Sequence, residues 1–192
     1  RRQFERFQLH AGLGRLVTEV IAPLNTLIGE GWMRGQVEVF QEHAYTELVQ
    51  RTLACALVGL SRSDAPGRPR VLLTTLRDEP HSLGLLMAEV VFSIDGAHCT
   101  SLGVQTPVAE IVRAREAFGA DIVALGFTGC NGPNSTLNGL VELRAKLPAD
   151  TELWAGGAVA ALRRRIVDGV RVLPDLSDIA TELKRWHATR AS

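Results

Sequence analysis

A change of hydrophobic period near residue 70 constrains the fold of this chain more than any other feature. After that point, short apolar runs alternate with helical patterns. The apolar runs predict strands over residues 71–76, 98–102, 122–125, 152–155 and 170–173. Helices are predicted over residues 85–94, 108–118, 136–146, 158–166 and 177–186. Short buried strands that alternate with helices are typical of a parallel sheet covered on both faces, so we predict a five-stranded α/β fold of the Rossmann or flavodoxin type.

The first third of the chain has the pattern of a helical bundle. Apolar residues recur at a spacing of three and four over residues 13–28 and again over residues 37–60, which predicts two antiparallel amphipathic helices. Pro23 is expected to bend the first helix because it removes a backbone donor. We therefore expect a helical bundle over residues 1–62, a linker over residues 63–69 and the α/β domain over residues 70–192.

Charge and composition exclude several classes of protein. The 21 Lys and Arg residues are balanced by 21 Asp and Glu residues, which does not favour binding to nucleic acid. No apolar stretch is long enough for a membrane span, and the first residues lack the apolar core of a signal peptide. The three cysteines, Cys55, Cys99 and Cys130, do not form a disulfide framework. We expect a cytoplasmic protein that binds neither nucleic acid nor a membrane through this chain, and no pattern indicates catalysis of its own.

The loops after the first, third and fourth predicted strands carry the residues best placed to bind a ligand. Ligands of parallel sheets bind beyond the carboxyl ends of the strands, and glycines there let a ligand approach the backbone. The sequence contains no Gly-x-Gly-x-x-Gly after the first strand, no Gly-Lys-Ser/Thr and no Cys-x-x-Cys. Nicotinamide, P-loop and zinc-motif sites are therefore not predicted.

One run in these loops resembles a known fingerprint. Glu79-Pro80-His81-Ser82-Leu83-Gly84, followed by Gly156-Gly157, resembles the cobalamin-binding pattern Asp/Glu-x-His-x-x-Gly … Ser-x-Leu … Gly-Gly. The resemblance implies that His81 is the lower axial ligand of cobalt and that Glu79 orients its imidazole. The Ser-x-Leu element is expected at Gly126-Phe127-Thr128. The cofactor-binding residues implied in this domain are Glu79, His81, Ser82, Gly84, Gly103, Gly126, Thr128, Gly156 and Gly157.

The helical part carries a second resemblance. Trp32, nine residues and then Glu42-His43 resemble the bundle motif of light-dependent regulators of the CarH and LitR type. The resemblance implies an upper pocket for the adenosyl group of adenosylcobalamin, shaped by Trp32, Met33, Glu42 and His43. Met33 stands where that family has a histidine. The chain lacks the family's DNA-binding domain, so we expect output through a homo-oligomer, a dimer or tetramer, or through a domain or partner outside this chain.

Two variations on this interpretation stay open. The module is also similar to the photocobilins, which combine it with a bilin pigment such as biliverdin, and Cys130 is then a candidate attachment point. The chain is also similar in build to corrinoid carrier proteins of methyltransferase systems, although those usually lack the Trp…Glu-His set.

Plainer interpretations compete for single residues. His81 alone would be an ordinary loop histidine, His43 a partly buried helix residue and Cys130 a small filler. Arg163, Arg164 and Arg165 are expected on a solvated helix face. Trp186 and His187 are expected to cap the last helix or pack at an interface.

Overall fold

The computed structural model describes Phe4, Phe7 and residues 11–60, 68–130, 132–157 and 167–190. The chain divides into two compact units, Arg1–Asp64 and Ala65–Ser192. The predicted helix over residues 158–166, with its three arginines, lies outside the described residues, and so does most of the expected linker.

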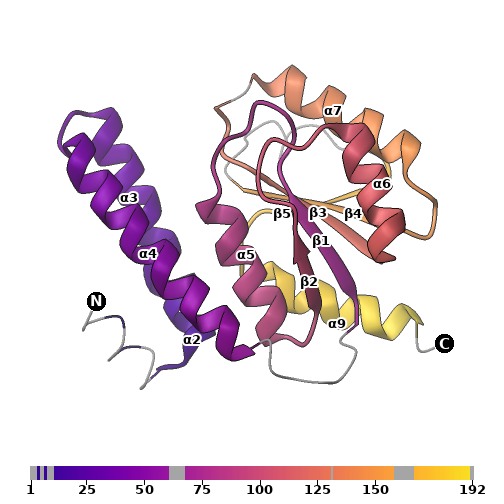
Figure 1. Cartoon of the computed structure of the whole chain (residues 1–192), viewed down its shortest axis with the longest axis horizontal. Coiled ribbons are helices and arrows are strands. Elements are labelled where there is room, and N and C mark those ends of the chain that lie inside the picture. Colours follow the sequence, from indigo (N-terminus) through magenta and orange to yellow (C-terminus); the bar gives the residue numbers. More distant parts are fainter. Residues whose placement is uncertain are drawn as a thin grey trace. The chain divides into compact units, whose positions relative to one another are not determined.

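The first unit is a helical hairpin with an irregular first arm. That arm consists of α2 (Leu13–Arg15), the π-helical segment η1 (Leu16–Ile21) and α3 (Ala22–Met33), and α4 (Val39–Leu60) packs beside α3 (Figure 1). The sequence predicts a plain helix bent at Pro23. Instead, the N–H of Ala22 bonds to the carbonyl of Val17, five residues back, because the register of regular helical bonds cannot continue through a proline.

Two contacts fix the hairpin. The hydroxyl of Tyr45 on α4 donates to the carbonyl of Ile21 at the end of η1, at 3.3 Å. The second helix begins at Val39 rather than at residue 37, because Val37 packs on Gly31, where an added Cβ would lie only 2.8 Å from Val37 Cγ2. Among the described residues of this unit, the fully buried apolar ones are Leu16, Val17, Ile21, Val49 and Leu53.

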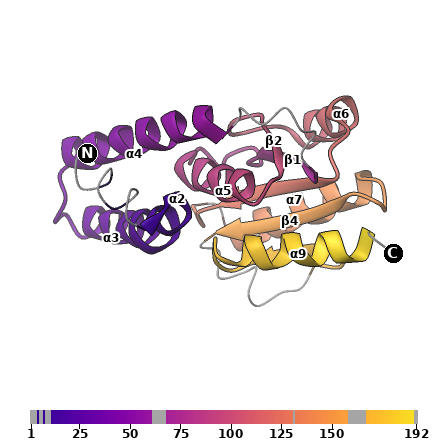
Figure 2. The same ribbon diagram turned by 90° about the horizontal axis from the view of Figure 1, so that it is seen from below.

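The second unit confirms the predicted α/β fold. Its strands are β1 (Arg70–Thr74), β2 (His98–Ser101), β3 (Ile122–Phe127), β4 (Glu152–Gly157) and β5 (Val170–Leu173), and they pair in the order β2-β1-β3-β4-β5. Every pair is parallel. Helices α5 (Leu83–Ile94) and α9 (Asp178–Arg190) cover one face, and α6 (Val108–Phe118) and α7 (Pro133–Lys146) cover the other (Figures 1 and 2).

Element ends differ from the predicted ones for local reasons. Strand β1 ends at Thr74 because Leu76 makes only an isolated bridge to Thr106. Strands β3 and β4 run two residues further than predicted, pairing Gly126 with Gly156. Helix α7 begins at Pro133 rather than at residue 136, since proline fits the first turn of a helix.

Trp186 is a core residue, which corrects the expectation of a cap or an interface. Its side chain is buried, and the guanidinium of Arg190 lies 4.5 Å from the centre of its ring. This contact accompanies the continuation of α9 to Arg190, beyond the predicted end at residue 186.

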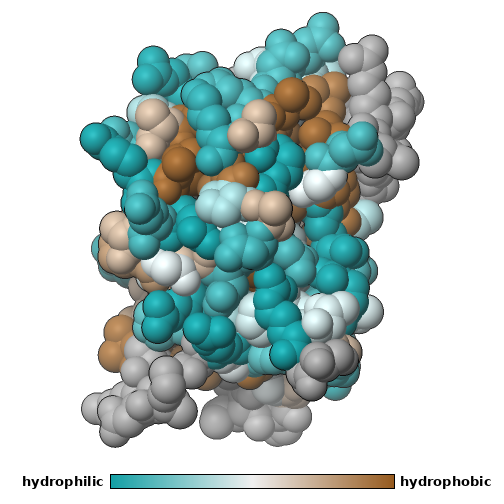
Figure 3. Space-filling model, turned by 90° about the vertical axis from the view of Figure 1, so that its right-hand side faces the viewer, coloured by the Kyte–Doolittle hydropathy of each residue, from teal (hydrophilic) through white to brown (hydrophobic). Residues whose placement is uncertain are grey.

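One face of the molecule is mostly polar. Hydrophilic side chains cover most of the face drawn in Figure 3, and the hydrophobic ones gather in smaller areas. Among the described helices, none combines the length and the apolar character that a bilayer crossing needs.

Candidate functional site

The candidate site is built on the loop that follows β1. Asp78 adopts a left-handed conformation (φ 73°), which turns the chain back toward the sheet. The hydroxyl of Thr75 then donates to the carbonyl of Glu79 at 2.6 Å and accepts the backbone N–H of Gln105 at 2.8 Å. The loop after β1 is therefore tied to the loop after β2, and this positions Glu79.

The carboxylate of Glu79 is the buried centre of the site. Its side chain is only 1% exposed. Oε2 accepts the backbone N–H of Thr128 at 2.9 Å, and the Thr128 hydroxyl lies 2.9 Å from Oε1 and 3.1 Å from Oε2. Thr128 follows β3 directly, so the two loops after neighbouring strands meet at this carboxylate.

These contacts keep Glu79 ionised. Burial raises the pKa of a carboxyl group, but here hydrogen bonds from the Thr128 backbone, His81, the Thr128 hydroxyl and Cys130 outweigh burial and lower the pKa of Glu79 below its ordinary value. A negative carboxylate is therefore present in a buried position at neutral pH.

His81 is held by this carboxylate and faces outward. Its Nδ1 lies 2.7 Å from Oε1 of Glu79, and the side chain is 53% exposed. An ionised carboxylate can only accept a hydrogen bond, so Nδ1 carries the proton in this contact, and in the neutral form of the imidazole the lone pair is on Nε2. The sequence places Glu79 beside His81, and that contact is present. The arrangement can present one oriented imidazole nitrogen to a metal centre.

Thr128 is the residue of the expected Ser-x-Leu position whose side chain reaches Glu79. The sequence predicts that element at Gly126-Phe127-Thr128, but Gly126 lies within β3, paired with Gly156. Thr128 supplies the hydroxyl that reaches the site, and Cys130 lies two residues after it.

Cys130 is the site residue that sequence reasoning missed. The sequence favours a small filler or a bilin attachment point, yet its exposed thiol lies 3.4 Å from Oε2 of Glu79. The signal available in the sequence is its position two residues after the site hydroxyl of Thr128.

The glycines of the predicted site divide into three groups. Gly157 is required by the fold, because its φ is +113° and an added Cβ would lie 1.9 Å from the carbonyl oxygen of Phe127. An added Cβ at Gly84 or Gly103 would meet no heavy atom within 4 Å, although the φ of +75° at Gly103 itself favours glycine. Gly126 and Gly156 are intermediate, with the nearest atoms at 3.7 and 3.5 Å.

Ser82, the remaining predicted residue of this loop, immediately precedes α5 and is partly buried. It therefore lies between the histidine and the open surface at Gly84.

The predicted residues of the first unit lie at the closed end of the hairpin. Trp32 and Met33 end α3 and are 51% and 74% exposed. Glu42 lies in the first turn of α4, where its Oε1 accepts the Thr46 hydroxyl at 2.7 Å and its Oε2 lies 3.6 Å from Nε2 of His43. His43 also lines a shallow hollow of about 530 Å³ with Ala44, Thr46 and Glu47.

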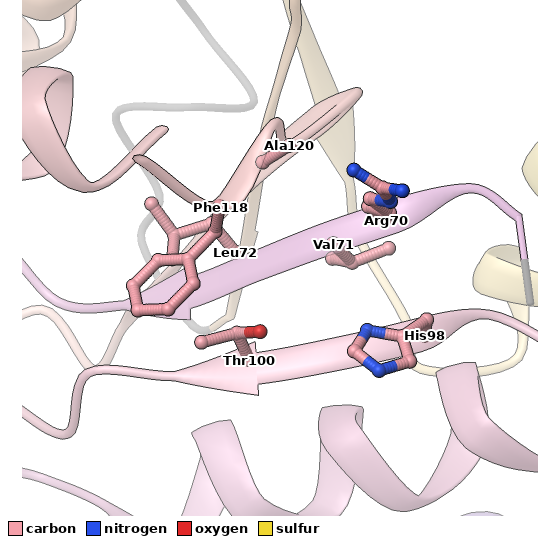
Figure 4. A pocket seen from close by; sticks show the side chains of 7 residues that line it. All are labelled: Arg70, Val71, Leu72, His98, Thr100, Phe118 and Ala120. Carbon is pink, nitrogen blue, oxygen red and sulfur yellow. The ribbon is translucent and has the colours of Figure 1, made fainter. Parts of the chain in front are cut away.

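Another cavity lies at the opposite end of the sheet from Glu79. It has a volume of about 230 Å³, and Figure 4 shows Arg70 and His98 toward one end of it and Phe118 and Thr100 toward the other. Arg70 and His98 are the first residues of β1 and β2, so this cavity lies at the amino ends of the strands. It contains none of the residues that the sequence predicts for cofactor binding.

Comparisons with known proteins show which proteins this chain resembles in sequence and fold. No family model matches the chain. The chain is 32% identical over 155 residues to the HTH-type transcriptional repressor CarH of Myxococcus xanthus, a match that covers 80% of this chain and 50% of the repressor. The chain thus spans about half the length of this curated relative.

Two solved structures share its fold. The monomethylamine corrinoid protein of Methanosarcina barkeri matches 94% of this chain and 88% of its own, with a TM-score of 0.73 and 13% identity. A cobalamin-binding protein from Desulfitobacterium hafniense DCB-2 matches 96% of this chain and 89% of its own, with a TM-score of 0.54 and 18% identity. The chain therefore has the fold of cobalamin-binding and corrinoid proteins.

Proposed function

We propose that this chain binds a cobalamin, with His81 as the lower axial ligand of cobalt. The observation that carries the proposal is the outward-facing His81, whose Nδ1 is held 2.7 Å from a buried carboxylate. A neutral imidazole with one nitrogen fixed by a carboxylate is the arrangement that metal-binding histidines use.

The neighbouring residues fit a large cofactor. Gly84 and Gly103 leave open space beside the histidine loop and the loop after β2. Among the described residues, Nε2 of His81 has no hydrogen-bond partner, so it is available to a ligand. Glu79 and Thr128 would hold the imidazole in place, and the paired glycines at the ends of β3 and β4 would leave room for the nucleotide tail.

Within this proposal, the cofactor is adenosylcobalamin and the module responds to light. When bound, adenosylcobalamin would supply a cobalt–carbon bond that light can cleave. Trp32 would pack on the adenosyl group, and Glu42 and His43 would contact its polar edge. The 32% identity to a transcriptional repressor supports a regulatory role, exerted through a homo-oligomer or through segments outside this chain.

Met33 affects which residue could bind cobalt on its upper side after illumination. A thioether binds cobalt(III) more weakly than imidazole does. Met33 would therefore not form a stable second axial bond after illumination, and His43 is the nearest histidine in the sequence that could replace it.

The test is an absorption spectrum of the purified protein with adenosylcobalamin, recorded in the dark and after green light. We expect a spectrum of histidine-ligated cobalamin in the dark and a different protein-bound spectrum after light. His81→Ala should remove the histidine-ligated spectrum. His98→Ala is the matched control, because His98 is an exposed histidine at the other end of the sheet. Equal binding and equal spectra for both variants would overturn the proposal.

A corrinoid carrier of a methyltransferase system is the second candidate. The fold likeness to the monomethylamine corrinoid protein, with a TM-score of 0.73, favours it. A carrier would pass a methyl group from methylcobalamin-loaded protein to a thiol or folate acceptor, and illumination would not change its assembly. Methyl transfer without a light response would favour this candidate over the sensor.

Bilin binding is an extension of the sensor proposal. Biliverdin added to the apoprotein should then produce an absorbance band in the red that Cys130→Ser removes if the attachment is through that thiol. If no new band appears, the module binds cobalamin without a bilin.

A further inference from the structure

Three side chains that can bind a metal lie together at the site, namely a carboxylate, an imidazole and a thiol. Oxygen from Glu79, nitrogen Nδ1 from His81 and sulfur from Cys130 all lie within 4.8 Å of one another. The pairs that share Glu79 are closer, at 2.7 Å for Nδ1 and 3.4 Å for Sγ. Both the imidazole and the thiol point their hydrogen-bonding atoms at the same buried anion.

This geometry points to a zinc site. We propose that, without cobalamin, the chain binds one Zn²⁺ through Glu79, Nδ1 of His81 and the thiolate of Cys130. Sulfur, nitrogen and carboxylate oxygen are the ligands that zinc prefers, and three protein ligands leave a fourth position for water. This proposal concerns the apoprotein, and only its consequence for cobalamin rests on the proposed function.

The distances allow the site to close around the ion. With Zn–S near 2.3 Å and Zn–N near 2.0–2.1 Å, tetrahedral ligand atoms lie roughly 3.5 Å apart. The three ligand atoms lie within 4.8 Å of one another, so no pair would approach by more than about 1.3 Å, while Nδ1 and Oε1 of Glu79, at 2.7 Å, would separate by about 0.8 Å. His81 and Cys130 both have exposed side chains, so small side-chain rotations can make this adjustment while the buried Glu79 stays fixed.

The charges balance in the zinc form. Cys130 releases its thiol proton to solvent and becomes a thiolate, while Glu79 is already ionised. The proton on Nδ1 of His81 moves to Nε2 through solvent, so the imidazole stays neutral. Two negative ligands and one neutral ligand then compensate the two positive charges of the ion, and no other reactant is needed.

The position of that imidazole proton has a consequence. Nε2 carries a proton in the zinc form, and a protonated nitrogen has no lone pair for cobalt. Zinc and histidine-ligated cobalamin therefore exclude one another at His81. The chain would exchange one metal species for the other through the tautomer of a single histidine.

The zinc site is tested first in the absence of cobalamin. Reduced apoprotein competes with a chromophoric chelator for Zn²⁺, and we expect one zinc per chain. Cys130→Ser should weaken the affinity at least tenfold. Cys55→Ser is the matched control, because Cys55 is another exposed cysteine and lies in the first unit. Zinc should also slow alkylation of Cys130 and leave that of Cys55 unchanged. Equal zinc affinity of the wild type and Cys130→Ser would overturn the site.

A second experiment tests the exclusion. Saturating zinc should reduce the affinity of the wild type for adenosylcobalamin at least tenfold, EDTA should restore it, and Cys130→Ser should show no such effect. Zinc binding with unchanged cobalamin affinity would overturn the exclusion alone. A protein that binds zinc but no cobalamin would overturn the proposed function and leave the zinc site standing.

Discussion

Thr128 hydrogen-bonds to both oxygens of the Glu79 carboxylate. Its hydroxyl lies 2.9 Å from Oε1 and 3.1 Å from Oε2, and its backbone N–H donates to Oε2 at 2.9 Å. These residues are 49 positions apart in the sequence and follow two adjacent strands, β1 and β3. Glu79 also contacts Nδ1 of His81, so the position of that imidazole depends on Thr128 at the end of β3 as well as on its own loop after β1.

The hydroxyl of Thr128 should set the pH range of the site. Thr128→Val keeps the backbone bond but removes the hydroxyl bonds, so the pKa of Glu79 should rise toward or above its ordinary value. A carboxyl group with a lowered pKa in the fold contributes stability above its ordinary pKa of 4.5, and this contribution is lost as the pH falls through the lower folded value. In the variant, the folded pKa lies closer to the ordinary value, so this contribution should be smaller and stability should fall less between neutral and acidic pH.

Carboxyl NMR of the apoprotein measures the pKa of Glu79 directly, without any cofactor. Thr128→Ser is the control, since it restores the hydroxyl and should titrate as the wild type does. A midpoint that does not move in Thr128→Val would show that the hydrogen bonds from the Thr128 backbone, His81 and Cys130 keep Glu79 ionised without the hydroxyl.

Gly84 should separate cofactor binding from folding. An added methyl at Gly84 meets no atom within 4 Å, and the residue lies in α5, so Gly84→Ala should keep or raise stability by about 0.5–1 kcal/mol. If the cofactor approaches this surface, the same variant should bind adenosylcobalamin more weakly. Urea unfolding of the apoprotein and a spectral titration measure the two effects.

Gly157 provides the contrast to Gly84. Gly157→Ala would place a Cβ 1.9 Å from the carbonyl oxygen of Phe127 at a φ of +113°, so it should destabilise the apoprotein by about 3 kcal/mol or more. Equal unfolding midpoints for Gly157→Ala and the wild type would mean that the β3–β4 pairing at this position is not as described.

Tyr45 gives a spectroscopic test of the helical hairpin. It is the single tyrosine in the sequence, and burial raises its pKa to about 12. A raised tyrosine pKa means that the neutral phenol stabilises the fold below the ordinary value of 10.0 and that this contribution is lost as the pH rises toward 12. The phenolate absorbance should therefore appear near pH 12 in the native protein and near pH 10 in denaturant.

Tyr45→Phe should cost about 1 kcal/mol, because it leaves the carbonyl of Ile21 without the hydroxyl bond. A native titration midpoint at the ordinary value would contradict the packing of Tyr45 between the two arms of the hairpin.

Glu152 should link the stability of the second unit to pH. Burial raises the pKa of this carboxyl, but hydrogen bonds from Trp154, Arg185 and Arg190 and the charge of Arg185 lower it overall. Its stabilising effect is thus present above pH 4.5 and is lost as the pH falls below that value. Glu152→Gln should cost about 1–3 kcal/mol at pH 7, and the difference from wild type should shrink as the pH falls below 4.5. Urea unfolding at neutral pH and below pH 4.5 measures it, and a difference that does not change with pH would contradict the ionic contacts.

The sequence alone predicted the five strands of the sheet. Where each helix and strand begins and ends depended on local interactions that the sequence pattern did not show. Apolar runs and glycine loops predict five parallel strands because burial on both faces leaves little choice of residue. The π-helical segment could not be predicted, because Pro23 signals a disrupted register without specifying whether the helix bends or widens. The prediction for Trp186 is wrong for a similar reason, since helical periodicity in a short terminal segment does not show how far the core extends.

For the site, the sequence predicts the near contacts better than the distant ones. Glu79 and His81 are two residues apart, so their contact follows from spacing. The contact of Thr128 with Glu79 depends on where β3 ends, and that end lies two residues beyond the predicted one. The same error hides Cys130, whose place beside Glu79 is visible only once Thr128 is correctly positioned.

The strand order β2-β1-β3-β4-β5 has a consequence for how the site comes into existence. From β1 the chain proceeds outward to the edge strand β2 before it crosses back to place β3 on the other side of β1. A nascent chain that ends before residue 122 therefore contains Glu79 and His81 but neither Thr128 nor Cys130. In such a chain the carboxylate of Glu79 has no strand end to enclose it. The site can therefore assemble only after β3 has paired with β1. If the chain were divided within α6, the contact between Glu79 and Thr128 would form only when the two fragments associate.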